Sequence, residues 1–148
     1  MQCTTEGRTG DVSGSGHLSE TGAGVGSGFT LNIPLPAYAG GLALQQVLVE
    51  LLAPAARRFA PELILASAGF DSHWRDQMAR LQFASRDYHA LATALHEIAS
   101  EFCSGQLVFF LEGGYDLPAL ADGSANVFRA LLGQRAKDTL GPPPHPQP

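Results

Sequence analysis

The stretch Glu62–Asp76, ELILASAGFDSHWRD, decides the fold class, because a short apolar run leads directly into a glycine turn that carries ionisable side chains. Glu62–Ser67 is too short for a buried helix and is typical of a strand covered on both faces, as in a parallel sheet. Gln106–Leu111 (QLVFFL) repeats this arrangement and runs into the glycine turn EGGYDLP. The two segments predict adjacent parallel strands, each with a polar loop at its carboxyl end.

Helices are predicted around these strands by the spacing of apolar residues. The apolar positions of Gly41–Phe59 recur at helical intervals, and Pro54 within that segment should kink its last turn. A further short strand is expected at Phe29–Pro34. Two more helices carry the stripes Tyr88, Leu91, Leu95, Ile98, Phe102 and Leu117, Leu120, Ala121, Ser124, Val127, Phe128, Leu131.

The ends of the last two helices are marked by residues that cap or terminate helices. Ser85 is the expected N-cap of the first and Gly105 its stop. Asp116 is the expected cap of the second, Pro118 lies in its first turn, and Gly133 ends it. The alternation of strands and helices predicts an α/β fold with a mostly parallel sheet. Two or three such strands make a poor core, so we expect a piece of a larger fold that lacks strands on one side.

The chain divides into three parts by composition. Residues 1–28 are glycine-rich and predict an irregular loop, either a flexible leader or a loop that closes over a site, and the leader is favoured. Residues 29–136 hold the predicted strands and helices. Residues 137–148 form a proline-rich tail, and for its last eight residues, GPPPHPQP, we expect no packing role.

Charge and cysteine content exclude several classes of protein. The 148 residues include 14 Asp and Glu against 9 Lys and Arg, giving a net charge of -5, which argues against direct binding to nucleic acid. No apolar run is long enough for a membrane helix, and no signal peptide is recognisable. Cys3 and Cys103 lie far apart in unrelated contexts. We therefore expect a cytoplasmic protein that does not act at a membrane.

The carboxyl ends of parallel strands are where open α/β sheets bind ligands. Asp71 and His73 form a D-x-H pair there, and both side chains could bind one Zn²⁺ ion. On spacing alone, the favoured alternative is that Asp71 caps a turn and His73 lies on the surface. Tyr115 follows two glycines and could donate a hydrogen bond to an oxyanion, or equally be a core aromatic residue.

Two longer motifs resemble a known family. ILASAGFDSHWRDQMARLQF (residues 64–83) and LVFFLEGGYDLPAL (residues 107–120) closely resemble the C-terminal half of zinc-dependent histone deacetylases. The resemblance is nearest to the class II-like bacterial branch, which includes acetoin-utilisation proteins and acetylpolyamine amidohydrolases. It covers about Ser13 to Gly133, and GSGHLSETGAGVGSGFTLNIPLP (residues 14–36) is similar to the family's glycine-rich active-site loop and the strand after it.

The resemblance implies a partial three-layer arginase/deacetylase-like fold and a deacetylase site. Asp71 matches a zinc ligand, and Tyr115 matches the phenol that polarises the amide carbonyl. Gly113 and Gly114 match the turn that lines the acyl-lysine channel, whereas His73 matches no zinc ligand of the family. The implied cofactor is Zn²⁺, and the implied reaction is hydrolysis of the N-acetyl amide of an acetylated lysine or polyamine.

The sequence also departs from the family's pattern. Its tandem histidines and D-x-H-x-G-N-G segment, which supply two zinc ligands and the general base, have no match in residues 1–12. Val12–Gly16 (VSGSG) replaces the usual loop sequence, and Gln77 replaces a proline, which should loosen that loop. We therefore expect these residues alone to bind zinc weakly and to lack hydrolase activity. The alternative is a non-catalytic α/β module that self-associates or binds a partner through an exposed sheet edge.

Overall fold

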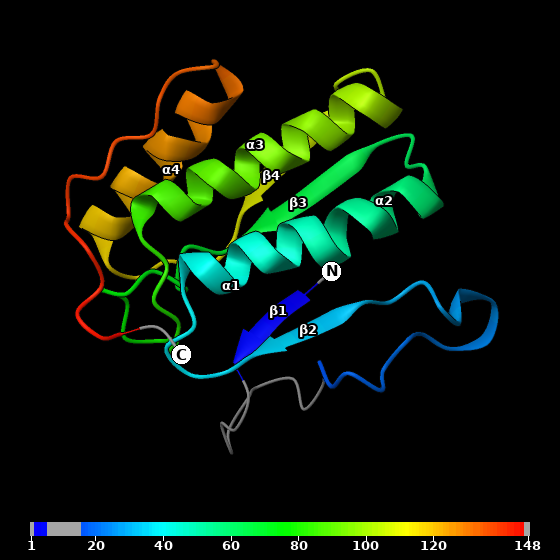
Figure 1. Ribbon diagram of the computed structural model, residues 1–148, viewed down its shortest axis with the longest axis horizontal. Coiled ribbons are helices and arrows are strands. Elements are labelled where there is room, and N and C mark those ends of the chain that lie inside the picture. Colours follow the sequence, from blue (N-terminus) through cyan, green and yellow to red (C-terminus); the bar gives the residue numbers. More distant parts are fainter. Residues whose placement is uncertain (1, 6–15, 147–148) are drawn as a thin grey trace.

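The computed structural model describes residues 2–5 and 16–146 of the chain, which form strands and helices in alternation (Figure 1). Residues 6–15, which include most of the Val12–Gly16 segment, lie outside the described part. The strands are β1 (Gln2–Thr5), β2 (Asn32–Leu35), β3 (Ile64–Ala68) and β4 (Leu107–Leu111). The helices are η1 (Gly24–Gly26), α1 (Gly41–Gln46), η2 (Val47–Leu52), α2 (Ala53–Phe59), α3 (Ser85–Phe102) and α4 (Leu117–Leu131).

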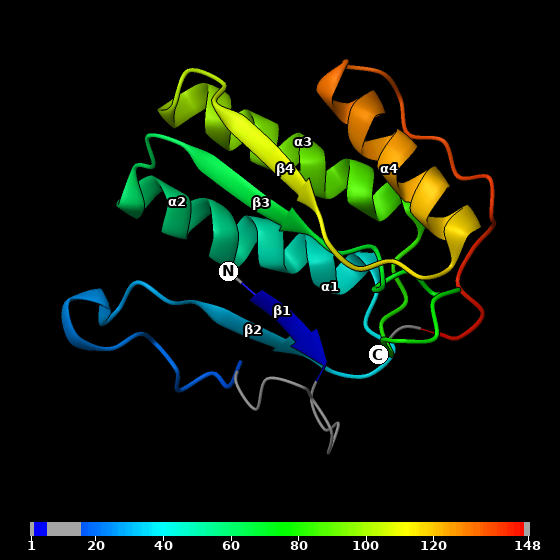
Figure 2. The same cartoon turned by 180° about the vertical axis from the view of Figure 1, so that it is seen from behind.

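The strands form two parallel pairs. β1 pairs with β2, and β3 pairs with β4 in a register that aligns Ile64 with Leu107 and Ala68 with Leu111. The arrows of all four strands point the same way when the molecule is seen from behind (Figure 2). The predicted α/β class with parallel strands is confirmed, although the described strands form two small sheets instead of one.

Strand β1 was not predicted, because the glycine-rich composition of residues 1–28 gave no strand pattern. Its backbone nevertheless pairs with β2 over four positions, from Gln2 opposite Asn32 to Thr5 opposite Leu35. A strand ladder is made of main-chain hydrogen bonds, so a neighbouring strand can order a segment that has no apolar alternation of its own. Residues 16–31 are also tied to β2, since the Asn32 side chain donates to the carbonyls of His17 and Glu20.

The helix predicted at Gly41–Phe59 forms over that range as α1, η2 and α2, drawn as one continuous ribbon in Figure 1. A kink was predicted in the last turn. The helix instead departs from α-helical geometry just before Pro54. In the π-helical segment η2, the Ala53 N–H donates to the Leu48 carbonyl, five residues back. This wider turn directly precedes Pro54, which has no N–H to donate. The helix ends where Ala60 adopts a left-handed conformation.

The N-cap of helix α3 lies one residue earlier in the chain than predicted. Its N-cap is Ala84, whose N–H donates to the Asp87 carboxylate at 2.8 Å, and Ser85 is the first helical residue. Burial raises the pKa of that Asp87 carboxyl. The predicted stop at Gly105 is confirmed, because its N–H donates back to the Ala99 carbonyl while its φ is +80°.

Helix α4 has the predicted ends. The Asp116 side chain accepts a hydrogen bond from the Ala119 N–H at 2.9 Å, and Pro118 lies in the first turn. Gly133 follows the helix with a φ of +65°. The backbone beyond it bonds to buried side chains, and at His145 this contradicts the expectation that the last eight residues have no packing role. Lys137 exchanges two hydrogen bonds with Asn126, and the His145 N–H donates to Gln82.

The hydrophobic core lies between the helices and one face of the strands, and it reaches the loop after β3. Its buried members are Ile33, Leu35, Ala39, Leu44, Val47, Leu48, Phe70, Leu81, Phe83 and Tyr88. Phe70 follows β3 and stacks against Tyr88 of α3, with ring centroids 4.8 Å apart. The Tyr88 hydroxyl donates to the Phe70 carbonyl, and burial raises the pKa of this phenol well above its usual value. The core therefore fixes the residue that precedes Asp71.

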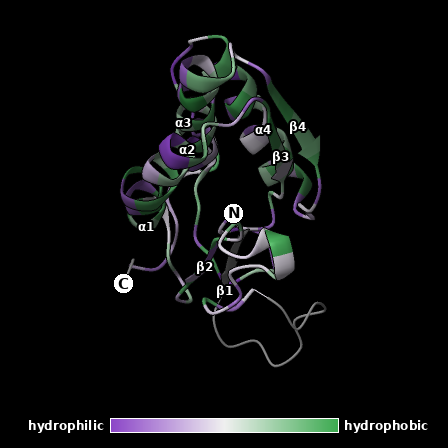
Figure 3. Ribbon diagram, turned by 90° about the vertical axis from the view of Figure 1, so that its right-hand side faces the viewer, coloured by the Kyte–Doolittle hydropathy of each residue, from purple (hydrophilic) through white to green (hydrophobic). Residues whose placement is uncertain are grey.

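The opposite face of β3 and β4 is uncovered. Leu65, Val108 and Phe110 point away from the core, and Phe110 is 50% exposed. Figure 3 colours the ribbons of both strands as largely hydrophobic. Because parallel sheets are normally covered on both faces, this agrees with the expectation of a partial fold. No helix in the described part of the chain is long and apolar enough to cross a membrane.

Replacing Gly123 with alanine should destabilise the fold. A Cβ at this position of α4 would lie 2.7 Å from the Phe70 ring, which is held by Tyr88. We expect Gly123→Ala to lower the free energy of unfolding by about 1–3 kcal/mol, despite the better helix propensity of alanine. Urea denaturation measures this, with Gly26→Ala as the control because Gly26 faces open space. Equal stability of Gly123→Ala and the parent chain would contradict this packing.

Candidate functional site

The candidate site lies where β3 and β4 end, at the two turns that the sequence singled out. The Glu112 N–H donates to the Ala68 carbonyl at 3.0 Å, and the Phe70 N–H donates to the Gly113 carbonyl at 2.8 Å. These bonds continue the β3–β4 ladder past the last strand residues. The turn that holds Asp71 and the turn that holds Gly113 therefore lie side by side.

Asp71 is partly buried against two glycines. A Cβ on Gly69 would lie 2.8 Å from Oδ1 of Asp71, and a Cβ on Gly113 would lie 3.1 Å from its Cγ. The carboxylate thus occupies the space that side chains at those two positions would need. The sequence predicted the adjacency of the two strands, and the glycines explain how a carboxylate fits between their turns.

Gly114 is required by both its conformation and its surroundings. Its φ is +135°, which side chains disfavour, and a Cβ there would lie 2.9 Å from Cβ of Phe70 and 3.2 Å from Cδ1 of Leu120. The pair Gly113 and Gly114 therefore lets the β4 turn approach the β3 turn closely. This packing is compatible with the expected channel lining, which stays a prediction.

Tyr115 projects from the β4 turn, and the alternative of a core aromatic residue is wrong. Its side chain is 64% exposed, and the phenol has no hydrogen-bond partner among the described residues. Its backbone, by contrast, is held: the Tyr115 N–H donates to Oδ2 of Asp76 at 2.6 Å. Asp71 and Tyr115 therefore leave adjacent strands at the same end of the sheet, with the phenol free to contact another molecule.

Asp76 is a site residue that sequence reasoning did not identify. Its carboxylate is buried and joins the loop after β3 to the turn after β4 through bonds to Tyr115 and Asp116. The residues it joins are about 40 positions apart in the chain. No local pattern could reveal this contact. Asp76 does lie within the motif of residues 64–83 that resembles the histone deacetylases, and this resemblance was the one sequence signal that included it.

A second link between the same loops is an ion pair. The Arg75 guanidinium donates to both carboxylate oxygens of Asp116, at 3.2 and 3.3 Å. The hydrogen bond from Arg75, together with that from the Ala119 N–H, lowers the pKa of the Asp116 carboxyl. Asp116 thus caps α4 and tethers the loop after β3 at the same time.

His73 is fully buried, so the expectation that it lies on the surface is wrong. Its Nδ1 accepts a hydrogen bond from the Arg75 N–H at 3.2 Å, which leaves Nε2 to donate to the Ser85 hydroxyl. Its ring also stacks against Tyr88. Burial lowers the pKa of this imidazole below its ordinary value. His73 therefore supports the loop as a neutral side chain.

The described residues do not form a zinc site by themselves. Within residues 16–146, no three His, Cys, Asp or Glu side chains are grouped so that they could hold a metal ion. Asp71 stands alone, whereas catalytic zinc normally has three protein ligands. Asp71 fits the role of one ligand, and the set as described does not fit a bound ion.

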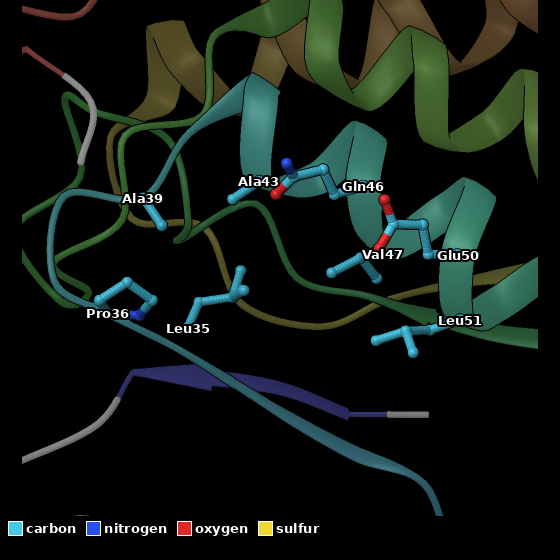
Figure 4. Close-up of a pocket in the computed structure, with 8 residues that line it drawn as sticks. All are labelled: Leu35, Pro36, Ala39, Ala43, Gln46, Val47, Glu50 and Leu51. Atoms are coloured by element: carbon cyan, nitrogen blue, oxygen red, sulfur yellow. The ribbon is translucent and has the colours of Figure 1, made fainter.

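Two hollows of the described surface lie away from this site. One, of about 360 Å³, lies between β2 and the helix formed by α1 and η2 and is lined by Leu35, Pro36, Ala39, Ala43, Gln46, Val47, Glu50 and Leu51 (Figure 4). The other, of about 550 Å³, borders α2 and includes Phe29, Phe59 and Ile98. Neither contains Asp71 or Tyr115, so neither is the expected acyl-lysine channel.

Comparison with known proteins identifies the family. The profile described as "Histone deacetylase domain" matches residues 13–131. The chain belongs to the histone deacetylase family. It is 47% identical over 125 residues to "Histone deacetylase 14, chloroplastic" of Arabidopsis thaliana and 36% identical over 121 residues to a "Probable deacetylase" of Archaeoglobus fulgidus.

The structural comparison agrees. The fold resembles the crystal structure of the HDA15 HD domain with a TM-score of 0.75 and 25% sequence identity, covering 87% of this chain. The chain spans only part of each relative: 84% of it matches 30% of the Arabidopsis protein, 81% matches 34% of the archaeal one, and the structural match covers 35% of the HDA15 chain. The partial deacetylase-like fold expected from the motifs is confirmed.

Protonation of His73 should make stability depend on pH in a defined window. Because the folded-state pKa of His73 is lowered, the unfolded chain takes up a proton first as the pH falls below about 6.5. We expect the free energy of unfolding to fall by about 1 kcal/mol between pH 7.5 and pH 5.5, and to level off below the folded-state pKa. Urea denaturation at several pH values measures this. His73→Asn keeps an acceptor for the Arg75 N–H and should be less stable but flatter across this window, and an unchanged slope would contradict the assignment.

Proposed function

We propose that this chain forms the C-terminal part of a zinc-dependent deacetylase that hydrolyses the N-acetyl amide of lysine or of a polyamine. The observation that carries the proposal is that Asp71 and the exposed Tyr115 lie on two adjoining turns, at the same ends of adjacent strands, in a histone deacetylase domain. The relatives named as deacetylases support the reaction class. For the substrate, we propose only the chemical class, an N-acetyl amide of lysine or of a polyamine.

Tyr115 is the proposed catalytic residue of this chain. When water attacks an amide carbonyl, negative charge develops on the carbonyl oxygen, and a donor aimed at that oxygen lowers the barrier. The phenol of Tyr115 has a proton to donate and no internal partner among the described residues. The turn made by Gly113 and Gly114 would line the channel through which the acetylated side chain reaches it.

Asp71 is the proposed metal ligand of this chain. A bound Zn²⁺ would supply Lewis-acid activation of the amide and of water. The carboxylate alone does not make such a site, so we propose that the remaining ligands and the general base are supplied by residues other than those that the structure describes. We propose that the chain acts together with such residues and is inactive as an isolated polypeptide.

The contribution of Tyr115 can be tested in a chimera in which the 125 matched residues of the Arabidopsis relative are replaced by those of this chain. We expect Tyr115→Phe to lower kcat for an acetyl-lysine peptide by about 10²–10³-fold, because an oxyanion donor is lost. Tyr38→Phe is the matched control, since Tyr38 is also exposed. A chimera that is folded and active but insensitive to Tyr115→Phe would refute the proposed role.

The purified 148-residue chain should not hydrolyse acetyl-lysine peptides and should retain little zinc after dialysis. The reason is that Asp71 has no companion ligands in the described part of the chain. Elemental analysis of the dialysed protein and a fluorescent deacetylation assay measure these properties. Zinc-dependent hydrolysis that Asp71→Asn abolishes would show that the chain is sufficient, contrary to the proposal.

A second candidate function is that of a non-catalytic module that binds a second copy of itself. It is favoured by the uncovered apolar face of β3 and β4 and by the fact that β3 is paired on one side only among the described strands. Unpaired strand edges and apolar faces promote association. In this second account, Asp71 and Tyr115 would take part in no reaction.

Sedimentation velocity distinguishes the two accounts for the isolated chain. Self-association predicts a dimer that forms with rising concentration and that Phe110→Asp weakens, because Phe110 lies on the uncovered face. Val25→Asp is the control, since Val25 is exposed in η1, away from β4. A monomer at high concentration would exclude the self-associating module.

A further inference from the structure

We propose that Asp76 is the positioning residue for Tyr115. In this inference, which rests on the proposed deacetylase function, the Asp76 carboxylate fixes the main chain of the β4 turn so that the phenol is presented toward Asp71. Asp76 itself would touch neither substrate nor metal. Its effect on the reaction would pass entirely through Tyr115.

The hydrogen bonds of Asp76 define the proposed clamp. Oδ2 accepts from the N–H of Tyr115 at 2.6 Å and from the N–H of Asp116 at 3.1 Å. Oδ1 accepts from the Met78 N–H at 2.9 Å, and the Asp76 N–H donates to the His73 carbonyl at 2.8 Å. The carboxylate therefore bonds to its own loop through one oxygen and to the β4 turn through the other.

The burial of Asp76 distinguishes it from an ordinary loop carboxylate. Only 6% of the residue is exposed, and a buried charge is costly unless it is fully hydrogen-bonded. Three main-chain N–H groups meet this requirement. Hydrogen bonds to an ionised acceptor are shorter and stronger than neutral ones, so this carboxylate can hold two loops in one geometry.

We infer that the position of the phenol depends on this clamp, because the ring itself makes few contacts with the described part of the chain. The Tyr115 side chain is exposed and has no hydrogen-bond partner among the described residues. On the other side of the turn, Gly114 is packed against Phe70 and Leu120. The main chain of Tyr115 is thus fixed between Gly114 and Asp76, which sets the direction in which its Cα–Cβ bond leaves the turn.

Arg75 and Asp116 add a parallel restraint that does not replace the clamp. Their ion pair lies at the next residue of the same turn and is partly exposed. An exposed ion pair contributes little and weakens with salt. The buried bonds of Asp76 are therefore the stronger restraint on Tyr115.

The first test uses the 148-residue chain itself. The chain has three tyrosines, Tyr38, Tyr88 and Tyr115, so labelling with fluorotyrosine gives three fluorine NMR signals that single Tyr→Phe variants assign. We expect Asp76→Ala to move the Tyr115 signal toward that of an unstructured peptide and to leave the Tyr38 signal in place. Asp76→Asn, which keeps one acceptor oxygen, should have a smaller effect. Asp87→Asn is the matched control, because Asp87 also accepts from a backbone N–H but at the start of α3.

The second test uses the deacetylase chimera and a double-mutant cycle. We expect Asp76→Asn to lower kcat about tenfold with little change in KM, because a misplaced catalytic group costs up to about 100-fold. In a chimera that already carries Tyr115→Phe, Asp76→Asn should have no further effect on kcat. A purely structural role would lower kcat by the same factor in both backgrounds.

The outcomes separate this inference from the proposed function. An inactive parent chimera would count against the proposed function, while the fluorine signals of the chain would still decide whether Asp76 positions Tyr115. An unchanged Tyr115 signal in a folded Asp76→Ala chain would overturn the inference. An equal loss of kcat with and without the Tyr115 hydroxyl would also overturn it. If Asp76→Ala fails to fold, the Asp76→Asn signals serve the same purpose.

Discussion

The hydrogen bond from the Phe70 N–H to the Gly113 carbonyl is the contact on which the site depends. It extends the pairing of β3 and β4 into their two turns, so that the turns cannot separate while the strands remain paired. Phe70 is in turn held by the core through Tyr88 and packed against α4 at Gly123. The geometry around Asp71 is therefore a consequence of core packing and of glycines that permit close approach.

The described residues hold only two of the side chains that we assign to the proposed site. Asp71 and Tyr115 lie on adjoining turns at the strand ends, whereas no group of three possible metal ligands is present in the described part of the chain. The chain spans about a third of the relatives it matches, and the outer face of β3 and β4 is apolar and uncovered. Both features agree with a partial deacetylase-like fold, because parallel sheets are normally covered on both faces.

The features that could be predicted from sequence are those with a local signal. The apolar runs at β3 and β4, the Asp116 cap and the stops at Gly105 and Gly133 each depend on residues within a few positions of one another. The features that were missed depend on distant contacts. Asp76 meets Tyr115 across 39 positions, His73 is buried by packing against α3, and β1 exists because β2 lies beside it. The place of the irregularity near Pro54 was missed for another reason, since the helix widens into a π-helical turn before the proline instead of kinking in its last turn.

The most direct measurement is a crystal structure of the deacetylase chimera with zinc and an acetyl-lysine peptide bound. The account predicts that the Asp71 carboxylate binds the metal and that the Tyr115 hydroxyl lies about 2.7–3.1 Å from the acetyl oxygen. A structure in which the peptide is bound but these two side chains face different sides of the sheet would contradict the account.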